Sequence, residues 1–387
     1  MAHKFKFPPL KNDRLLRAAR GEEVDKIPVW IMRQTGKYLP EYRQLFDEQD
    51  YYIISEVPSK VSEVTLQPIR RFDDLDAAII FSDILVIVEA LGMELEIKPD
   101  IGIVLPNPLL QPDDIKMLEY PVDIKAALGY LFDAISVTRL ELEGKVPLIG
   151  FSGAPWTLMC YMIEGDRSKT MSKAKYWLYK YPTESEQLLK ILTETVTDFL
   201  IEQGKAGAQF LQIFEYNAEY LDPECFSKFA LPSIASICKN VKEKLKQENL
   251  DIPLAIYAKG AHYALEELAK TGYDIIGIDW TVDPILARQA VGPNITLQGN
   301  LDPCALYAKD SDLIELTNAM VNKFGKSRYI ANLGHGIYPD VEPERVRTLL
   351  NFFKANLDWL VRKIRNTVNK KLANDGYKRH ELFRDFA

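Results

Sequence analysis

The stretch PVWIMRQTGKYLPEYR, residues 28–43, begins as an apolar run and turns polar at Arg33. Its first five residues have the composition of a buried β-strand. Arg33, Gln34 and Lys37 then crowd together beside Gly36, whose missing Cβ gives the backbone extra freedom. We therefore interpret this stretch as a strand followed by a loop that gathers cationic and polar side chains, as a ligand site would.

Seven more short apolar runs recur along the chain, each bounded by turn residues or by a helical pattern. Most are continuously apolar rather than alternating, as expected of strands buried on both faces of a parallel sheet. Amphipathic helical patterns lie between them. Besides residues 28–32, the predicted strands are residues 76–81, 146–151, 208–214, 252–258, 274–279, 295–299 and 328–333.

Eight strands with helices between them predict an α/β fold, a (β/α)8 TIM barrel. An open doubly wound sheet is the alternative, with less support because no glycine-rich dinucleotide or P-loop motif occurs in the sequence. We expect residues 1–387 to form one barrel domain with a short N-terminal arm and a basic tail beyond about residue 365. One helix is predicted to start at a capping box of Thr183 and Glu186 and to stop at Gly204.

The composition of the 387 residues, 47% hydrophobic and 27% charged, is ordinary for a soluble globular protein. A formal net charge of −7 argues against a nucleic-acid-binding surface. No apolar run is long enough to span a membrane, and residues 1–10 lack the apolar region of a signal peptide, so we expect a cytoplasmic protein. The four scattered cysteines fit a reducing compartment and argue against a structural zinc site.

Polar residues follow the predicted strands, at the end where barrel enzymes carry their chemistry. Asp83 follows the second strand, Tyr216 the fourth and His335 the eighth. Ordinary structural explanations exist beside the functional one. A lone arginine such as Arg33 often pairs with a carboxylate of its own loop, Asp83 is placed to cap a helix, and Tyr161 lies in an apolar segment typical of a core. His335 lies between two glycines, which offer little packing, and this favours a function.

The sequence contains neither a zinc-ligand cluster nor the G-x-S-x-G motif of a hydrolase nucleophile. The residues therefore predict a barrel that works without a metal or a cofactor. Its mouth would mix cations with carboxylates, an arrangement that suits a small molecule carrying several negative charges.

The chain resembles the uroporphyrinogen decarboxylase family over roughly residues 8–360. This resemblance implies one (β/α)8 domain, usually assembled as a homodimer. It also implies that the four acetate side chains of uroporphyrinogen III lose their carboxyl groups, without a cofactor, to give coproporphyrinogen III in haem biosynthesis. Besides the opening stretch, the segments that carry the resemblance are FSDIL (81–85), GAPWTLMCYMIEG (153–165), LQGNLDPCALYA (297–308) and NLGHGIYPDVEPERV (332–346).

The resemblance further implies roles for single residues. Asp83 would accept hydrogen bonds from the pyrrole N–H groups and stabilise a cationic intermediate. Arg33 would bind substrate carboxylates and help to deliver a proton. A pyrrole protonated on carbon is its own electron sink, so no cofactor is needed. The residues expected to bind the tetrapyrrole substrate are Arg33, Gln34, Lys37, Asp83, Tyr161, Tyr216 and His335.

Four positions depart from the usual pattern of the family. The family usually has an arginine where this chain has Lys37 and a basic residue near Phe46. It usually has a serine at Tyr216, and a glutamine at Glu89. The alternative is therefore a divergent paralogue that binds a tetrapyrrole or related pigment with weak or no decarboxylase activity. A corrinoid-linked methyltransferase shares the barrel superfamily but typically uses a His/Cys zinc site, which the sequence lacks.

Overall fold

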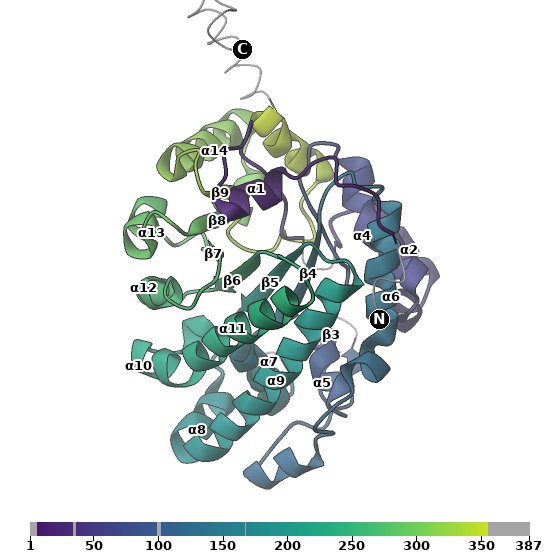
Figure 1. The fold of residues 1–387 in the computed structure, drawn as a ribbon, viewed down its shortest axis with the longest axis vertical. Helices are drawn as coiled ribbons and strands as arrows, with labels where there is room; N and C mark the ends of the chain where they lie inside the picture. The colour runs from purple at the N-terminus through teal and green to yellow at the C-terminus, as the bar shows by residue number, and fades with distance from the viewer. Residues whose placement is uncertain (1–5, 34–35, 99–101, 167, 355–387) are drawn as a thin grey trace, which may run out of the picture.

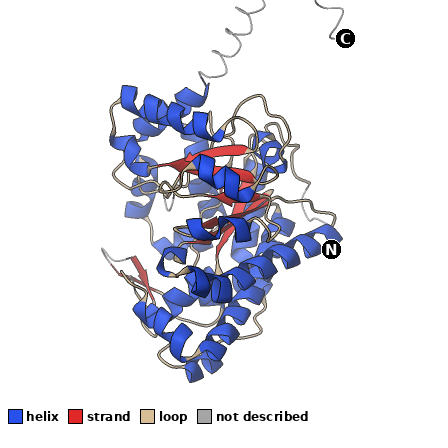
Figure 2. Ribbon diagram, turned by 90° about the vertical axis from the view of Figure 1, so that its left-hand side faces the viewer, coloured by secondary structure: helices blue, strands red, loops and turns tan. Residues whose placement is uncertain are grey.

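The computed structural model describes residues 6–33, 36–98, 102–166 and 168–354. Seven parallel strands form one curled sheet with helices around its outside (Figure 1 and Figure 2). The order β1-β4-β5-β6-β7-β8-β9 places each strand beside its neighbours in the chain. These strands are β1 (Ala78–Ile79), β4 (Leu148–Gly153), β5 (Phe210–Glu215), β6 (Leu254–Ala258), β7 (Ile275–Gly277), β8 (Thr296–Leu301) and β9 (Tyr329–Leu333).

Residues 28–30 close this sheet into a barrel by bonding to both of its edges. On one side, the Asp76 N–H donates to the Val29 carbonyl at 2.8 Å, and the Asp76 carboxylate accepts from the Val29 N–H at 2.9 Å. On the other side, Val29 forms a parallel bridge with Ala331 in β9. The buried Asp76 carboxylate also pairs with Arg14 at 2.5 Å, so charge reinforces the backbone at this junction.

The predicted barrel is confirmed, since seven of the eight predicted runs form the paired strands and residues 28–32 contain the bridge. The run at residues 76–81 is reduced to the two paired residues of β1. The sequence did not predict the separate antiparallel pair of β2 (Glu96–Lys98) and β3 (Gly102–Val104). Because β2 is exposed along its length, it lacks the buried apolar pattern that identifies the other strands.

Helices cover the outer face of the barrel, and the longest of those described, α9, packs against both α6 and α11. None of the described helices is long and apolar enough to cross a membrane. A final helical stretch covers residues 343–354, and the predicted basic tail lies outside the described residues. The other α-helices are α1 (Arg14–Arg20), α2 (Pro40–Glu48), α3 (Tyr51–Glu56), α4 (Pro58–Arg71), α5 (Val86–Ala90), α6 (Ile124–Glu141), α7 (Pro155–Glu164), α8 (Ser172–Lys180), α9 (Pro182–Ala206), α10 (Pro223–Cys225), α11 (Leu231–Gln247), α12 (Leu265–Leu268), α13 (Pro284–Val291) and α14 (Asp310–Phe324).

The start and end predicted for α9 are wrong. The helix begins at Pro182 rather than at a Thr183–Glu186 capping box, because proline suits the first helical position, where no N–H partner is needed. It continues through Gly204 and ends one residue before Gly207, whose φ is +124°. Gly204 instead permits close packing, since a Cβ there would lie 2.9 Å from a methyl carbon of Leu245 in α11.

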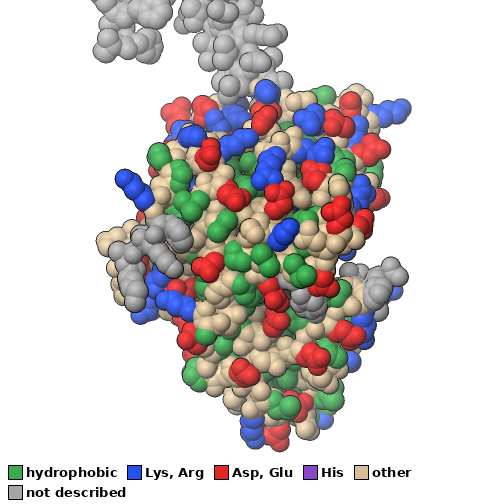
Figure 3. Space-filling model, turned by 90° about the vertical axis from the view of Figure 1, so that its right-hand side faces the viewer, with side chains coloured by type: hydrophobic (Ala, Val, Ile, Leu, Met, Phe, Trp, Pro, Cys, Tyr) green, Lys and Arg blue, Asp and Glu red, His purple; other side chains and the backbone are tan. Residues whose placement is uncertain are grey.

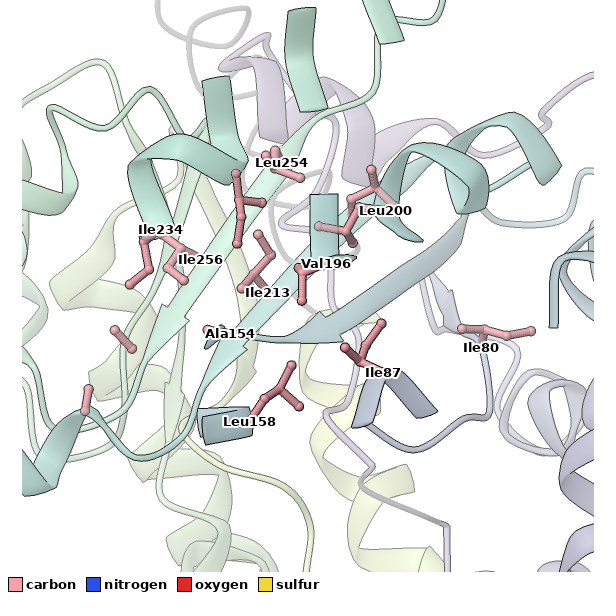
Figure 4. Close-up of a cluster of buried hydrophobic side chains, with 14 of the residues drawn as sticks. Ile80, Ile87, Ala154, Leu158, Val196, Leu200, Ile213, Ile234, Leu254 and Ile256 are labelled. Carbon is pink, nitrogen blue, oxygen red and sulfur yellow. The ribbon is translucent and has the colours of Figure 1, made fainter. Parts of the chain in front are cut away.

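The outer core fills the space between the sheet and the helices. Ile213 in β5 and Ile256 in β6 point towards the helices, and Leu158 of α7 and Val196 of α9 pack against the sheet (Figure 4). All four side chains are fully buried. This burial on the helix-facing side explains why the strands read as continuous apolar runs.

The inner core fills the barrel itself and includes a short polar chain. Trp30 donates its indole N–H to Gln298 at 2.9 Å, and the Gln298 amide donates to Gln212 at 3.1 Å. Leu15 and Leu16 of α1 belong to the same buried cluster. Helix α1 also contacts β8 and β9, where the Thr296 hydroxyl, at the start of β8, donates to a carbonyl of α1 at 2.9 Å. Helix α1 therefore covers the amino-terminal end of the barrel, and the opposite end is left for the site.

Charged side chains of both signs are mixed over the face drawn in Figure 3, with hydrophobic groups scattered among them. No extended basic patch stands out on that face. This distribution agrees with the formal net charge of −7.

Candidate active site

The carboxyl end of the barrel carries the predicted site residues that the structure describes. Gln34 lies outside the described residues. The others are Arg33 after the closing segment, Lys37 in the same loop, Asp83 after β1, Tyr161 in α7 after β4, Tyr216 after β5 and His335 after β9. Side chains far apart in the sequence therefore meet at one end of the fold because parallel strands all end there.

Arg33 is buried, with only 4% of its surface exposed. Its Nη1 donates to the Val64 carbonyl at 3.0 Å, and its guanidinium lies over the ring of Phe81 at 5.9 Å. The second terminal nitrogen, Nη2, has no hydrogen-bond partner among the described residues. Burial lowers the pKa of Arg33 to about 10, so the group stays charged at neutral pH. A buried cation with an unused donor is suited to an anionic ligand.

The loop after Arg33 depends on Gly36. This glycine has φ +100°, and a Cβ there would lie 3.1 Å from the Tyr42 ring and 3.4 Å from Nη1 of Arg33. Its N–H donates to the Arg33 carbonyl at 3.1 Å. The neighbouring Lys37 is exposed, so its ammonium group reaches solvent beside the site rather than the interior.

Phe46 belongs to an aromatic cluster beneath Arg33. Its ring stacks on Tyr42 at 4.1 Å and meets Phe81 edge-on at 5.8 Å. Tyr51 completes the cluster at 5.9 Å from Phe46. Where the family resemblance implies a basic residue, this chain therefore has a packed ring that supports the surface under Arg33.

Asp83 lies in the turn before α5. Its Oδ1 accepts a hydrogen bond from the Leu85 N–H at 2.8 Å. Leu85 itself is the N-cap of α5 and no side chain among the described residues caps the helix, so the expectation that Asp83 is the helix cap is wrong. No hydrogen bond to its Oδ2 is found among the described residues, and the side chain is half-buried. Burial raises the pKa of Asp83, and the Leu85 hydrogen bond lowers it. Asp83 forms no ion pair with Arg33. The Arg33 guanidinium instead lies over the ring of Phe81, which is two residues before Asp83 in the sequence.

Tyr161 lies beside a cavity of about 570 Å³. The tyrosine is half-buried on α7, and Cys160 and Tyr220 line the same cavity. Polar walls come from Ser168 and Lys169 in the loop that follows α7. Tyr161 is therefore placed at an opening and not in the closed core that its apolar neighbours in the sequence suggest.

Tyr216 and His335 are neighbours, with ring centroids 5.9 Å apart. The Tyr216 ring stacks on Phe214 at 5.3 Å, and its hydroxyl lies 3.6 Å from the sulfur of Met32. His335 also meets the Trp280 ring at 5.8 Å. Burial lowers the pKa of His335, which favours the neutral imidazole. An aromatic wall with a neutral histidine can accept or donate single hydrogen bonds to a ligand.

Glu215, the last residue of β5, was not among the predicted catalytic or substrate-binding residues. Its carboxyl is fully buried and accepts hydrogen bonds from the Thr157 hydroxyl and, at 3.3 Å each, from the N–H groups of Thr157 and Asn217. The Thr157 hydroxyl in turn accepts from the Tyr216 N–H at 2.8 Å. Burial raises the pKa of Glu215 to about 7. The only sequence signal was an acidic residue at the end of an apolar run.

The Glu215 network ties two loops of the site together. It joins the start of α7, the helix that carries Tyr161, to the turn that carries Tyr216. No group of three or more His, Cys, Asp or Glu side chains in the described part of the chain is placed to hold a metal ion. The described site therefore offers a buried cation, a half-buried carboxylate and an aromatic wall.

Comparison with known proteins places this site in a family. The family model described as uroporphyrinogen decarboxylase (URO-D) matches residues 10–355. The chain belongs to the uroporphyrinogen decarboxylase family. Curated relatives in this family include the uroporphyrinogen decarboxylase of Ovis aries, 55% identical over 341 residues, which are 88% of this chain and 93% of that protein. The Schizosaccharomyces pombe uroporphyrinogen decarboxylase is 52% identical over 349 residues, covering 89% of this chain and 97% of that protein.

Two solved structures share the fold at low sequence identity. A methyltransferase from Methanosarcina mazei aligns with a TM-score of 0.73 at 19% identity, covering 90% of this chain and 99% of that one. A B12-independent methionine synthase from Shewanella sp. aligns with a TM-score of 0.52 at 11% identity, covering 79% and 88%. At these identities the likeness supports the fold alone.

Proposed function

We propose that this chain removes the acetate carboxyl groups of uroporphyrinogen III to give coproporphyrinogen III. The two relatives reported above carry this name and are more than half identical to the chain over nearly their whole length. The observation that carries the proposal within the site is Arg33, a buried guanidinium with an unused donor that lies over the Phe81 ring. Together with Asp83, this group suits a substrate that combines carboxylates with pyrrole N–H groups.

The reaction follows from this arrangement. A proton added to a pyrrole carbon makes the ring cationic, and the bond between the acetate methylene and its carboxylate then breaks. The electron pair of that bond neutralises the ring, CO₂ leaves, and a proton on the methylene gives the methyl group while the ring carbon loses its added proton. One proton is thus consumed for each CO₂ released. Asp83 stabilises the cationic stage through the pyrrole N–H groups, as a fixed negative charge near developing positive charge.

The remaining residues orient the macrocycle. In this proposal Arg33 binds one side-chain carboxylate through Nη2 and helps to deliver the first proton. Lys37 offers a second cation from the exposed part of the same loop. Tyr161, Tyr216 and His335 offer single hydrogen bonds, and we extend the same binding role to Gln34 on the family resemblance. No cofactor or metal enters this scheme because the protonated pyrrole accepts the electrons.

We further propose that the protein works as a homodimer in the cytoplasm, as the resemblance implies for the family. Light scattering coupled to size-exclusion chromatography measures the mass directly. A particle of twice the 44.2 kDa chain mass is expected. A monomer at micromolar concentration contradicts the assembly but leaves the proposed reaction in place.

An anaerobic assay tests the reaction, because uroporphyrinogen must be kept reduced. Purified protein is incubated with uroporphyrinogen III, and the products are oxidised and separated by the number of carboxyl groups. Ordered appearance of hepta-, hexa-, penta- and tetracarboxylic products is expected. Binding of the octacarboxylic porphyrin without any product would instead favour the divergent paralogue.

Restoring two family residues is expected to improve turnover. The variant Lys37→Arg/Tyr216→Ser should raise kcat/KM for uroporphyrinogen by about tenfold, because arginine binds a carboxylate through two parallel donors and serine opens space beside His335. Phe46 is left unchanged, since its ring packs between Tyr42 and Phe81. The measurement is the initial rate over a range of substrate concentrations.

The matched control for this pair is Lys60→Arg, a lysine-to-arginine change on α4. It is expected to leave kcat/KM as in the wild type. An equal kcat/KM in the double variant and the wild type would mean that Lys37 and Tyr216 serve the reaction as well as the usual family residues do.

A further inference from the structure

Lys259 is a cation at the mouth of the barrel that none of the roles above uses. It follows β6 directly, and its N–H donates to the Glu215 carbonyl at the end of β5, at 2.9 Å. Its ammonium nitrogen lies 2.6 Å from Oε1 of Glu219. The two side chains are 20% and 35% exposed, so the ion pair borders on water.

The backbone fixes where Glu219 stands. Glu219 lies in the short helix η2 (Ala218–Tyr220), and a Cβ on Gly260 would lie 2.4 Å from the Cβ of Glu219. Gly260 has φ +75° and donates its N–H to Asp279 at 2.7 Å. The loops after β5 and β6 therefore pack closely against each other. Lys259 meets Glu219 because of this backbone packing and not because two long side chains happen to touch.

The ion pair lies within electrostatic range of His335. After burial and a backbone hydrogen bond, the next influences on the pKa of His335 are Lys259, which lowers it, and Glu219, which raises it. His335 in turn contacts the Tyr216 ring. The N–H of Lys259 bonds to Glu215, the residue before Tyr216, so Lys259 follows the strand next to the one that leads into Tyr216.

An exchange of carboxylates at Lys259 would cost little. A part-exposed ion pair contributes little free energy, because water solvates both partners well when they separate. The nearby Asp279 offers a contrast, since it is buried and accepts from the N–H groups of Gly260 and Thr281 at 2.7 Å and 2.8 Å. Glu219 is partly exposed and pairs with Lys259 at the edge of the protein, so it is the carboxylate of this region that can be replaced.

We infer that Lys259 is a further carboxylate-binding residue of the site and that Glu219 is its internal counterion, displaced by a substrate carboxylate. The inference rests on the proposed function, because it requires a ligand with several carboxylates. Glu219 then sets a threshold for binding. A ligand must offer Lys259 a better placed carboxylate than the one it already has, which favours ligands whose carboxylates are arranged around a large ring.

Titration with uroporphyrin tests the inference without requiring turnover. This oxidised octacarboxylate is coloured, so its Kd follows from absorbance or fluorescence. The variant Glu219→Gln should lower the Kd by about two- to fivefold, because Lys259 no longer has a competitor. The variant Lys259→Met should raise it by about tenfold. The double variant should bind as weakly as Lys259→Met alone, since no lysine remains to be freed.

The matched control is Lys242→Met. Lys242 pairs with Asp274 at 2.7 Å and is similarly part-exposed, but Asp274 precedes β7, at the other end of the barrel. This variant should keep the wild-type Kd. The opposite signs of the two single variants exclude a merely structural ion pair, because loss of a structural pair would weaken binding in both.

Each other outcome overturns the inference. A Kd that rises in both single variants means that the pair supports the fold, and a Kd unchanged in both means that Lys259 does not meet the ligand. If Lys259→Met does not fold, Glu219→Gln alone decides, because tighter binding is expected only from a freed lysine. If the variants show the predicted Kd pattern but the wild type makes no product, the decarboxylase proposal is refuted and this inference stands.

Discussion

Replacing Asp83 by asparagine is expected to preserve the fold and to lower kcat by about 10²–10³-fold, the usual loss when one group that stabilises a transition state is removed. In the wild type the Leu85 N–H donates to Asp83 at 2.8 Å, and the asparagine oxygen can accept the same hydrogen bond. The turn before α5 therefore keeps this contact. What disappears is the negative charge beside the cationic pyrrole. The measurement is kcat in the anaerobic assay, with thermal unfolding to verify the fold.

The control for Asp83→Asn is Glu89→Gln, which removes a neighbouring carboxylate on α5 whose side chain is exposed. Water screens the charge of an exposed side chain, so this change should alter kcat by less than about threefold. Near-normal turnover by Asp83→Asn would refute the electrostatic role of Asp83. A rise in KM with unchanged kcat would mean that Asp83 binds the substrate and does not stabilise the intermediate.

The barrel could be predicted because its strands are buried on both faces. Continuous runs such as residues 208–214 and 252–258 match the bounds of the observed β5 and β6 to within two residues. Residues 28–32 were less well predicted as a strand. Val29 forms a single bridge to Ala331 on one side, and on the other side its N–H bonds to the Asp76 side chain instead of a strand carbonyl. A side chain that substitutes for a strand partner leaves no periodic signal in the sequence.

Only those residues of the candidate site could be predicted whose immediate sequence neighbours are unusual. Arg33 and His335 stand out because they follow apolar runs beside glycines. Glu215 and Lys259 do not, since their roles depend on the register of β5 against β6, which brings the Lys259 N–H to the Glu215 carbonyl. Contacts between loops that are 40 residues apart, such as Lys259 with Glu219, arise from tertiary packing.

The buried Glu215 is expected to make the stability of the protein depend on pH in an unusual direction. Its carboxyl has a pKa of about 7 in the folded chain, raised by burial from the ordinary 4.5. Between these values the folded state holds a proton that the unfolded state has released. Stability from this group is therefore complete below about pH 4.5 and is lost as the pH rises through about 7, a loss of about 3 kcal/mol at 1.36 kcal/mol per pKa unit.

Glu215→Gln should remove this dependence, because the amide does not ionise. Chemical unfolding at pH 5, 6, 7 and 8 measures the free energy of unfolding of both proteins, and the exposed Glu224→Gln on α10 controls for the loss of any glutamate. The glutamine variant should carry a fixed cost, since its NH₂ group cannot accept from the Thr157 N–H as the carboxyl does. Relative to the wild type, it should nevertheless gain about 2–3 kcal/mol between pH 5 and pH 8, since part of the loss lies below pH 5. If the free energy of unfolding depends on pH in the same way in both proteins, Glu215 has the same pKa in the folded and unfolded chains. The hydrogen bonds that join Tyr216 to α7 would then not require a protonated carboxyl.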